Sequence, residues 1–250
     1  MRTADIFTRD GETVTIPIFR KDDSEFELDH EGHAAYFKKY YSYCFGVLSI
    51  LAELLDISVP EICIWNSYSP LFNEKLQVFG EGEEEGAYMH KESLAFYKSK
   101  SGHIGNCIIF GDELLSYKEK WLGVMAHEMR HIFQHDRKMN MKGLKKGIYS
   151  SVNNSLEIEA DAYGIGFLTA VTGKSIDKCT EIVCGSSKDI IPADKMAERK
   201  KKAFDFADKI KSCCPGIKRK IGKQPTRIGN YVHYIKRSFG RCETDRSCKE

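Results

Sequence analysis

The chain has 250 residues, of which 42% are hydrophobic and 30% charged, and its formal net charge is +2. This composition is typical of a globular protein with a buried core, and it excludes a disordered chain, a collagen-like fibre and a disulfide-stapled miniprotein. The longest apolar stretch, residues 44–55, is well short of the roughly 20 residues that a transmembrane helix needs. We therefore expect no membrane partner.

The first part of the chain is expected to contain one arm, one helix and several short strands. Weak alternation of polarity over residues 1–29 indicates a short strand or arm. Apolar residues at helical spacing then predict a helix over residues 31–55. Short β-rich runs follow and predict strands at residues 62–65, 88–90, 94–97 and 107–110.

The second part of the chain is expected to be helical. Apolar periodicity predicts a helix over residues 117–136, and a second helix begins near Asn153 or Asn154 and ends at Gly173. A charged amphipathic helix spans residues 193–210, and a tail begins at Ser212. Helix, strands and then helices in this order predict an α+β fold.

Cysteine usage bears on the compartment. The chain has nine cysteines, an odd number, with no CxxC pair, and no secretory signal is visible after Met1. This pattern indicates free thiols in a reducing compartment, so we expect a cytoplasmic protein.

The helix expected over residues 117–136 carries an HExxH motif at residues 127–131. His127 and His131 are four residues apart, so they share one helix face and can hold one metal ion. Glu128 is about 100° round the helix, beside the ion, where a general base for a metal-bound water belongs. The alternative without a metal is a pair of surface histidines on an amphipathic helix.

A second group of carboxylates stands at the start of the next expected helix. Glu157 and Asp161 are also four residues apart, so both can face the HExxH helix. One carboxylate can complete a His₂Glu zinc site while the other accepts the N–H of a ligand histidine. Glu159 points elsewhere and is the weaker candidate. The alternative is acidic charge at a helix N-terminus, which the helix dipole stabilises.

The pairing of HExxH with E-x-x-A-D at residues 157–161 resembles the gluzincin zinc metallopeptidases. It is most similar to the small members: the CAAX-type and HtpX-type endopeptidases, the ImmA/IrrE-type regulatory proteases and the minigluzincins. The firm match covers about residues 104–170. A metzincin is excluded, because Gln134 and Arg137 occupy the positions where that class needs glycine and a third histidine.

The resemblance implies a zincin-like fold, in which a small mixed sheet packs against the active-site helix and a glutamate-bearing helix, with extra C-terminal helices. We predict an N-terminal arm at 1–30, a zincin-like metallopeptidase domain at 31–175 and a helical, basic, Cys-containing extension at 176–250, packed on or continuing that domain. By the same resemblance, His127, His131 and Glu157 bind one Zn²⁺ per chain. Glu128 is then the general base, and Asp161 supports a ligand from behind, with His127 as the expected partner.

The expected reaction is hydrolysis of peptide bonds in a peptide or protein substrate, through a metal-bound water activated by Glu128. A developing oxyanion needs a further donor. Related enzymes use a downstream Tyr, His or Arg, and the candidates, among which the sequence does not choose, are Tyr163, Tyr231, His233 and Arg227. Packing against the core is the alternative role for the aromatic residues around position 231.

The C-terminal tail suggests a second class of function. Residues 211–250 contain 11 basic against 3 acidic residues, with aromatic residues between them. Such a tail can contact a phosphate backbone, although a solvated surface is the more common role, so nucleic acid is not the favoured partner. The alternative to a protease is therefore a DNA- or protein-binding regulator that keeps a metalloprotease fold with weak or no hydrolysis. A protease that cuts a regulatory protein target would combine the two.

Overall fold

The computed structural model describes only part of the chain. The described backbone comprises residues 2–7, 13–19, 33–65, 86–89, 98–99, 107–111, 114, 117–137 and 154–222. Side chains are described for most of the helical part of this set and for few residues of the strands. All statements about contacts below refer to these residues.

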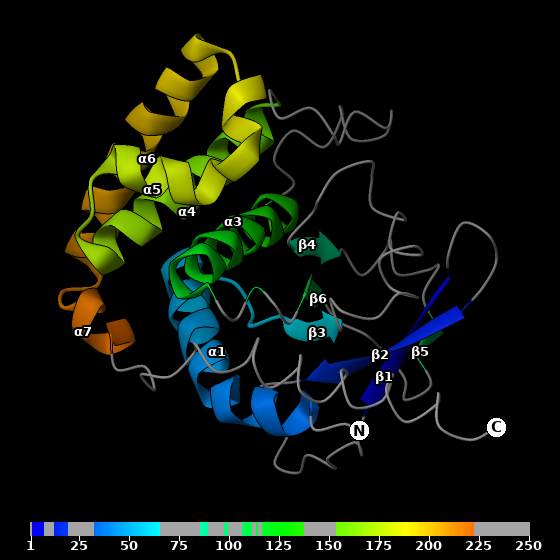
Figure 1. The fold of residues 1–250 in the computed structure, drawn as a ribbon. Helices are drawn as coiled ribbons and strands as arrows, with labels where there is room; N and C mark the ends of the chain where they lie inside the picture. The colour runs from blue at the N-terminus through cyan, green and yellow to red at the C-terminus, as the bar shows by residue number, and fades with distance from the viewer. Residues whose placement is uncertain are drawn as a thin grey trace, which may run out of the picture.

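Five helices and two shorter helical turns follow one another along the described chain (Figure 1). They are α1 (His33–Leu55), α3 (Lys118–Asp136), α4 (Ser155–Thr172), α5 (Ile176–Cys184), the 3₁₀ turn η6 (Gly185–Ile190), α6 (Ala193–Cys213) and α7 (Ile217–Gly222). The predicted helices over 31–55, 117–136 and 193–210 agree with α1, α3 and α6 to within a few residues.

The described strands pair into one sheet through their backbones. They are β1 (Arg2–Phe7), β2 (Thr13–Phe19), β3 (Glu61–Trp65), β4 (Gly86–Met89), β5 (Lys98–Ser99) and β6 (Cys107–Gly111). Their order is β4-β6-β3-β2-β1-β5, with β3 and β6 parallel and the other neighbours antiparallel. The predicted strand at 94–97 lies outside the described residues.

The predicted α+β, zincin-like fold class is wrong for this structure. Helices make up 82% of the residues whose side chains are described, and those residues contain almost no strand. Strands supply only Glu61, Ile62, Ile108 and Phe110 to that set. The physical reason is that the long apolar runs lie on helices. The described core is therefore built by helices packing on helices rather than by a sheet.

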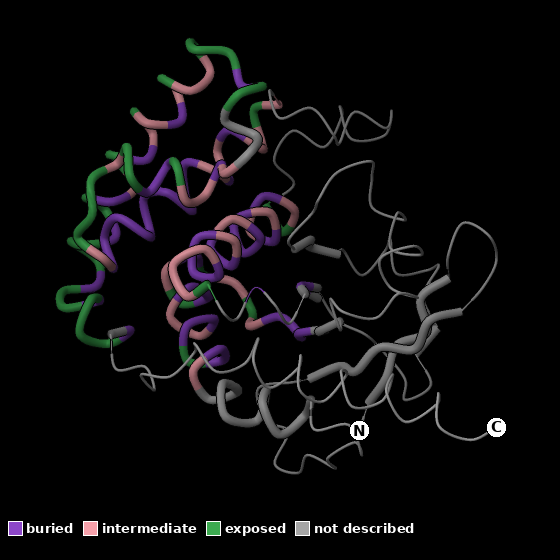
Figure 2. Tube along the Cα trace, viewed as in Figure 1, coloured by how far each residue is buried: buried purple, intermediate pink, exposed green. Residues whose placement is uncertain are grey.

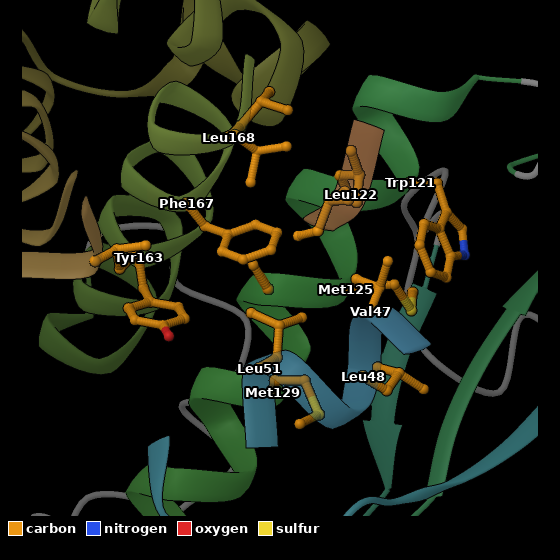
Figure 3. Packing of buried hydrophobic residues seen from close by; sticks show 14 of the residues in the cluster. Val47, Leu48, Leu51, Trp121, Leu122, Met125, Met129, Tyr163, Phe167 and Leu168 are labelled. Atoms are coloured by element: carbon orange, nitrogen blue, oxygen red, sulfur yellow. The ribbon is translucent and has the colours of Figure 1, made fainter. Parts of the chain in front are cut away.

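The core lies where α1, α3 and α4 meet (Figure 3). Trp121 and Met125 of α3 face Leu48 of α1, while Phe167 of α4 approaches α3 from the other side. Each of these four side chains is almost completely buried. Burying one such side chain is worth about 1.5–3 kcal/mol, so this cluster holds α3 firmly between its neighbours.

Helix α4 is the most deeply buried element. From Ala162 to Val171 every residue is buried, and the helix packs against α3, α5 and α6 (Figure 2). A helix that is apolar nearly all round is typical of a position at the centre of a helical body. Its start and end follow the prediction: Asn154 caps the first turn, and Gly173 ends the helix in a left-handed conformation with φ 76°.

The sequence did not predict every described helix, and some of its predictions are not tested by the described residues. Helix α5 and the short α7 were not predicted as separate helices. The predicted domain boundaries near residues 30 and 175 stay predictions. Helix α6, which follows residue 175, packs along α4, which precedes that residue. Among the described residues, no helix is long and apolar enough to cross a membrane.

Candidate metal centre

Helix α3 presents the two histidines of the HExxH motif. Its buried face, which includes Met125, Met129 and Ile132, packs into the core and fixes the rotation of the helix. His127 and His131 lie on the adjacent edge, half-buried and facing α4. Their ring centroids are 4.6 Å apart, and their Nε2 atoms are 2.9 Å apart. The helix spacing therefore brings both rings to one place, as the sequence predicted.

The first turns of α4 bring the carboxylates to the same place. The side chain of Asn154 accepts a hydrogen bond from the backbone N–H of Leu156, so α4 begins at Ser155 and Glu157 lies in its first turn. Glu157 Oε2 lies 3.5 Å from His127 Nε2, and Glu157 Oε1 lies 3.4 Å from His131 Nε2. The carboxylate thus spans both rings.

These three side chains form a group that could hold a metal ion: one ligand atom from each of His127, His131 and Glu157 lies within 4.8 Å of the others. Two ligands about 2.1 Å from a tetrahedral ion stand about 3.4 Å apart. The two Nε2 atoms are 2.9 Å apart, and each lies 3.4 or 3.5 Å from a different oxygen of Glu157, which is close to that value. Two imidazole nitrogens and one carboxylate oxygen are also the donor set that catalytic zinc takes in many hydrolases. The residues present therefore fit a zinc ion.

Glu128 is buried beside this group. Its Oε1 lies 3.9 Å from His127 Nε2, and its side chain is only 8% exposed. Because Glu128 is one residue after His127, its side chain leaves the helix about 100° round from the ligand face. It therefore lies near the three-residue group without being a member of it, as the spacing of the motif predicted.

The charges of the group stabilise one another. Burial alone would lower the pKa of His127, but hydrogen bonds to Asp161 and Glu157, together with the charge of Glu128, hold that pKa well above its usual range. Burial would likewise raise the pKa of Glu157 and Asp161. Their contacts with the histidines, and with Arg199 in the case of Asp161, instead lower both values. Both carboxylates are therefore ionised across the neutral pH range.

Asp161 lies behind His127, on the side away from Glu157. Its Oδ1 is 3.0 Å from His127 Nδ1. Its other oxygen, Oδ2, accepts a hydrogen bond of 2.7 Å from Nε of Arg199, which belongs to α6 and is completely buried. A carboxylate only accepts hydrogen bonds when ionised, so Nδ1 of His127 carries a proton, and once the ring is neutral the lone pair is on Nε2.

Sequence reasoning missed two residues of this arrangement, Arg199 and Gln134. Arg199 lies in a charged helix far along the chain, and no local pattern distinguishes it from the lysines around it. Gln134 is three residues after His131 on the same helix, and its Oε1 lies 2.9 Å from His131 Nδ1. The i, i+3 spacing could have indicated that contact.

The weaker candidate, Glu159, faces away from the three-residue group. It forms an ion pair with Arg130 of α3, and its Oε2 lies 3.4 Å from Nε2 of Gln134. Helix geometry explains the difference, because Glu159 leaves α4 about 200° round from Glu157.

Of the four candidates for an oxyanion donor, one, Tyr163, lies among the described residues. Tyr163 is buried against α6, where its ring packs edge-on against Phe206 with centroids 5.2 Å apart. Its hydroxyl has no hydrogen-bond partner among the described residues. Tyr231, His233 and Arg227 lie outside the described part of the chain, so their proposed role stays a prediction.

Comparisons of the chain with protein-family models, with curated proteins and with solved structures found no match. The chemistry assigned to the site therefore rests on its own residues and distances.

Proposed function

We propose that this protein is a zinc-dependent endopeptidase that hydrolyses peptide bonds of a protein substrate. The observation that carries the proposal is the convergence of two imidazole nitrogens and one carboxylate within 4.8 Å, with a buried glutamate beside them. A structural zinc site is closed by four protein ligands and needs no base. The three ligands found among the described residues, with Glu128 adjacent, are instead typical of a site that leaves one position for a reactant.

Zinc held by His127, His131 and Glu157 would polarise the scissile carbonyl and make water more acidic. The protein's own residues perform the remaining steps. Glu128 takes a proton from the attacking water and delivers it to the leaving amine nitrogen as the C–N bond breaks. Asp161 keeps the proton of His127 on Nδ1, so that Nε2 stays available as a ligand.

The test compares metal content and hydrolysis in three forms of the protein. Wild type, His131→Ala and Glu128→Gln are measured by elemental mass spectrometry and by cleavage of a panel of internally quenched peptides. Wild type should carry about one zinc and cleave, His131→Ala should lose both properties, and Glu128→Gln should keep zinc but lose cleavage by at least a hundredfold. Glu119→Gln, which replaces a partly exposed glutamate of the same helix paired with Lys174, serves as the matched control and should behave as wild type.

Each outcome separates the proposed protease from the regulator considered above. Zinc in wild type without cleavage of any peptide, or of a denatured protein, favours a regulator with a metal centre. Cleavage that survives Glu128→Gln contradicts the mechanism. An absence of zinc from wild type even after reconstitution contradicts the metal centre itself.

A further inference from the structure

We propose that Gln134 is the positioning residue of His131: its amide fixes which nitrogen of that ring is free to bind metal. The inference rests on the proposed metal centre and assigns a role to a residue outside the HExxH and E-x-x-A-D motifs. The contact that motivates it joins His131 Nδ1 to Gln134 Oε1 at 2.9 Å.

The first step is the orientation of the Gln134 amide. Its Nε2 lies 3.0 Å from the carbonyl oxygen of Leu156 and 3.4 Å from Oε2 of Glu159. A carbonyl and an ionised carboxylate can only accept hydrogen bonds, so the NH₂ end of the amide must face them. The reversed amide would place its oxygen against two other oxygens. The oxygen end of Gln134 therefore faces His131.

The second step is the tautomer of His131. An amide oxygen accepts a hydrogen bond and does not donate one, so the partner nitrogen of the ring must carry the proton. Nδ1 of His131 thus carries a proton, so the neutral ring is the Nδ1–H tautomer, and its Nε2 faces Glu157 and His127. The two histidines reach the same tautomer by different means, because Asp161 is charged and Gln134 is neutral.

The third step is the rigidity of Gln134 itself. Its side chain is only 2% exposed. Glu159, one of its two acceptors, is itself paired with Arg130, whose guanidinium lies over the rings of Phe133 and Tyr163. Gln134 therefore joins α3 to the first turns of α4, the same turns that carry Glu157. Loss of the amide frees the His131 ring and loosens the junction that places the third ligand.

The test replaces the amide by an apolar side chain of similar size, Gln134→Leu, in the full chain. Cobalt(II) is used as the probe, because its d–d absorption reports ligand geometry. We expect Gln134→Leu to bind cobalt(II) about 10–100-fold more weakly than wild type, with an altered absorption band. Gln134→Glu keeps an acceptor for His131 Nδ1 but sets its second oxygen against the oxygens of Leu156 and Glu159. It should therefore lose stability, yet keep more of the cobalt affinity than Gln134→Leu.

A matched control separates positioning from a general loss of stability. Thr180→Val removes another buried hydrogen-bonding side chain, in α5, where the hydroxyl donates to the carbonyl of Ile176. It should lower stability without changing cobalt affinity. Equal cobalt affinity and equal spectra for wild type and Gln134→Leu would overturn the inference.

A second readout needs no metal and does not depend on the proposed activity. Nitrogen NMR of histidine-labelled, metal-free protein, at an alkaline pH where both rings are neutral, should show His131 as the Nδ1–H tautomer in wild type, with that preference lost in Gln134→Leu. An Nε2–H tautomer in wild type would overturn the inference. If the wild-type protein binds no metal, the proposed function is contradicted. The NMR measurement then still decides whether Gln134 fixes the tautomer of His131.

Discussion

At the scale of single residues, the two histidines of α3 differ in what holds their Nδ1 atoms. His127 contacts the carboxylate of Asp161 at 3.0 Å, whereas His131 contacts the neutral amide of Gln134 at 2.9 Å. Both arrangements place the proton of a neutral ring on Nδ1 and its lone pair on Nε2. Two nitrogen lone pairs 2.9 Å apart repel each other unless a proton or a metal ion lies between them. The metal-free site should therefore hold a proton, and its stability should depend on pH.

The first prediction concerns this pH dependence in the metal-free protein. The pKa of His127 is raised above its usual 6.5, so its contribution to the free energy of unfolding is complete below pH 6.5 and is lost as the pH rises through the raised value. Glu157 and Asp161 have lowered pKa values, so their contribution is present above about pH 4.5 and is lost as the pH falls through those values. Urea unfolding should show highest stability between about pH 4.5 and 6.5.

Above about pH 6.5, zinc affinity should increase while the stability of the metal-free protein falls. Zinc displaces the proton, so its affinity should increase as the pH rises through the pKa of His127. The variant His127→Gln should remove most of the decline in metal-free stability at alkaline pH, whereas His135→Asn, on the same helix, should keep it. An unchanged pH profile in His127→Gln would contradict the assignment.

The second prediction concerns Tyr163, a sequence candidate for the oxyanion donor. Its buried hydroxyl lacks a partner among the described residues, so removing it relieves an unpaired polar group. Tyr163→Phe should leave the free energy of unfolding unchanged or slightly higher, by up to about 1 kcal/mol, and should leave peptide cleavage intact. A tenfold loss of cleavage at equal stability would show that Tyr163 acts in the reaction after all.

At the scale of elements, the site depends on how closely α3 and α4 approach. Gly123 of α3 and Gly164 of α4 meet at the crossing, where a Cβ on Gly164 would stand 2.7 Å from the carbonyl oxygen of Gly123. The same Cβ would stand 3.5 Å from the Cβ of His127. The absence of a side chain here lets the two helices approach closely enough for Glu157 to reach both histidines.

The third prediction tests this crossing. Gly164→Ala should push α4 away from α3, because the new methyl group meets backbone that cannot rotate aside. We expect a loss of about 1–3 kcal/mol in the free energy of unfolding, together with weaker zinc binding. Gly46→Ala in α1 is the matched control, since nothing described lies within 4 Å of its Cβ position. The control should be neutral or stabilising by up to about 1 kcal/mol.

At the scale of the whole molecule, the described part of the site is assembled from three helices that are distant in the chain. Helix α3 supplies the histidines, α4 supplies the carboxylates, and α6 supplies Arg199. Helix α6 packs along α4, and a Cβ on Gly166 would stand 2.7 Å from the carbonyl oxygen of Ala203, so this contact is also close. Residues beyond the predicted boundary at 175 thus support His127 of the candidate metal centre.

The fourth prediction tests that support. Arg199→Met leaves the carboxylate of Asp161 without its buried cation, and breaking a buried pair typically costs about 3–5 kcal/mol. Urea unfolding should show a loss of that size, and zinc affinity should fall because Asp161 no longer holds His127 in one orientation. Asp161→Asn combined with Arg199→Met should recover part of the stability. Lys202→Met, which removes an exposed ion pair with Glu198, should cost less than about 1 kcal/mol.

The sequence by itself determined the positions of the ligands along their helices. His127 and His131 are one helical turn apart, and so are Glu157 and Asp161, so periodicity alone fixed which side chains share a face. Capping chemistry likewise determined where α4 begins and ends, at Asn154 and Gly173. These are local properties, since they depend only on neighbouring residues.

Only the tertiary structure decided the fold class and the outer contacts of the site. The α+β prediction failed because it assumed that the short β-rich runs form much of the core, whereas the described core is formed mainly by helices. Arg199 could not be found from its neighbours, because its role depends on the packing of α6 against α4. Long-range packing sets which surfaces meet, and no local pattern of residues encodes the partner that lies across such a contact.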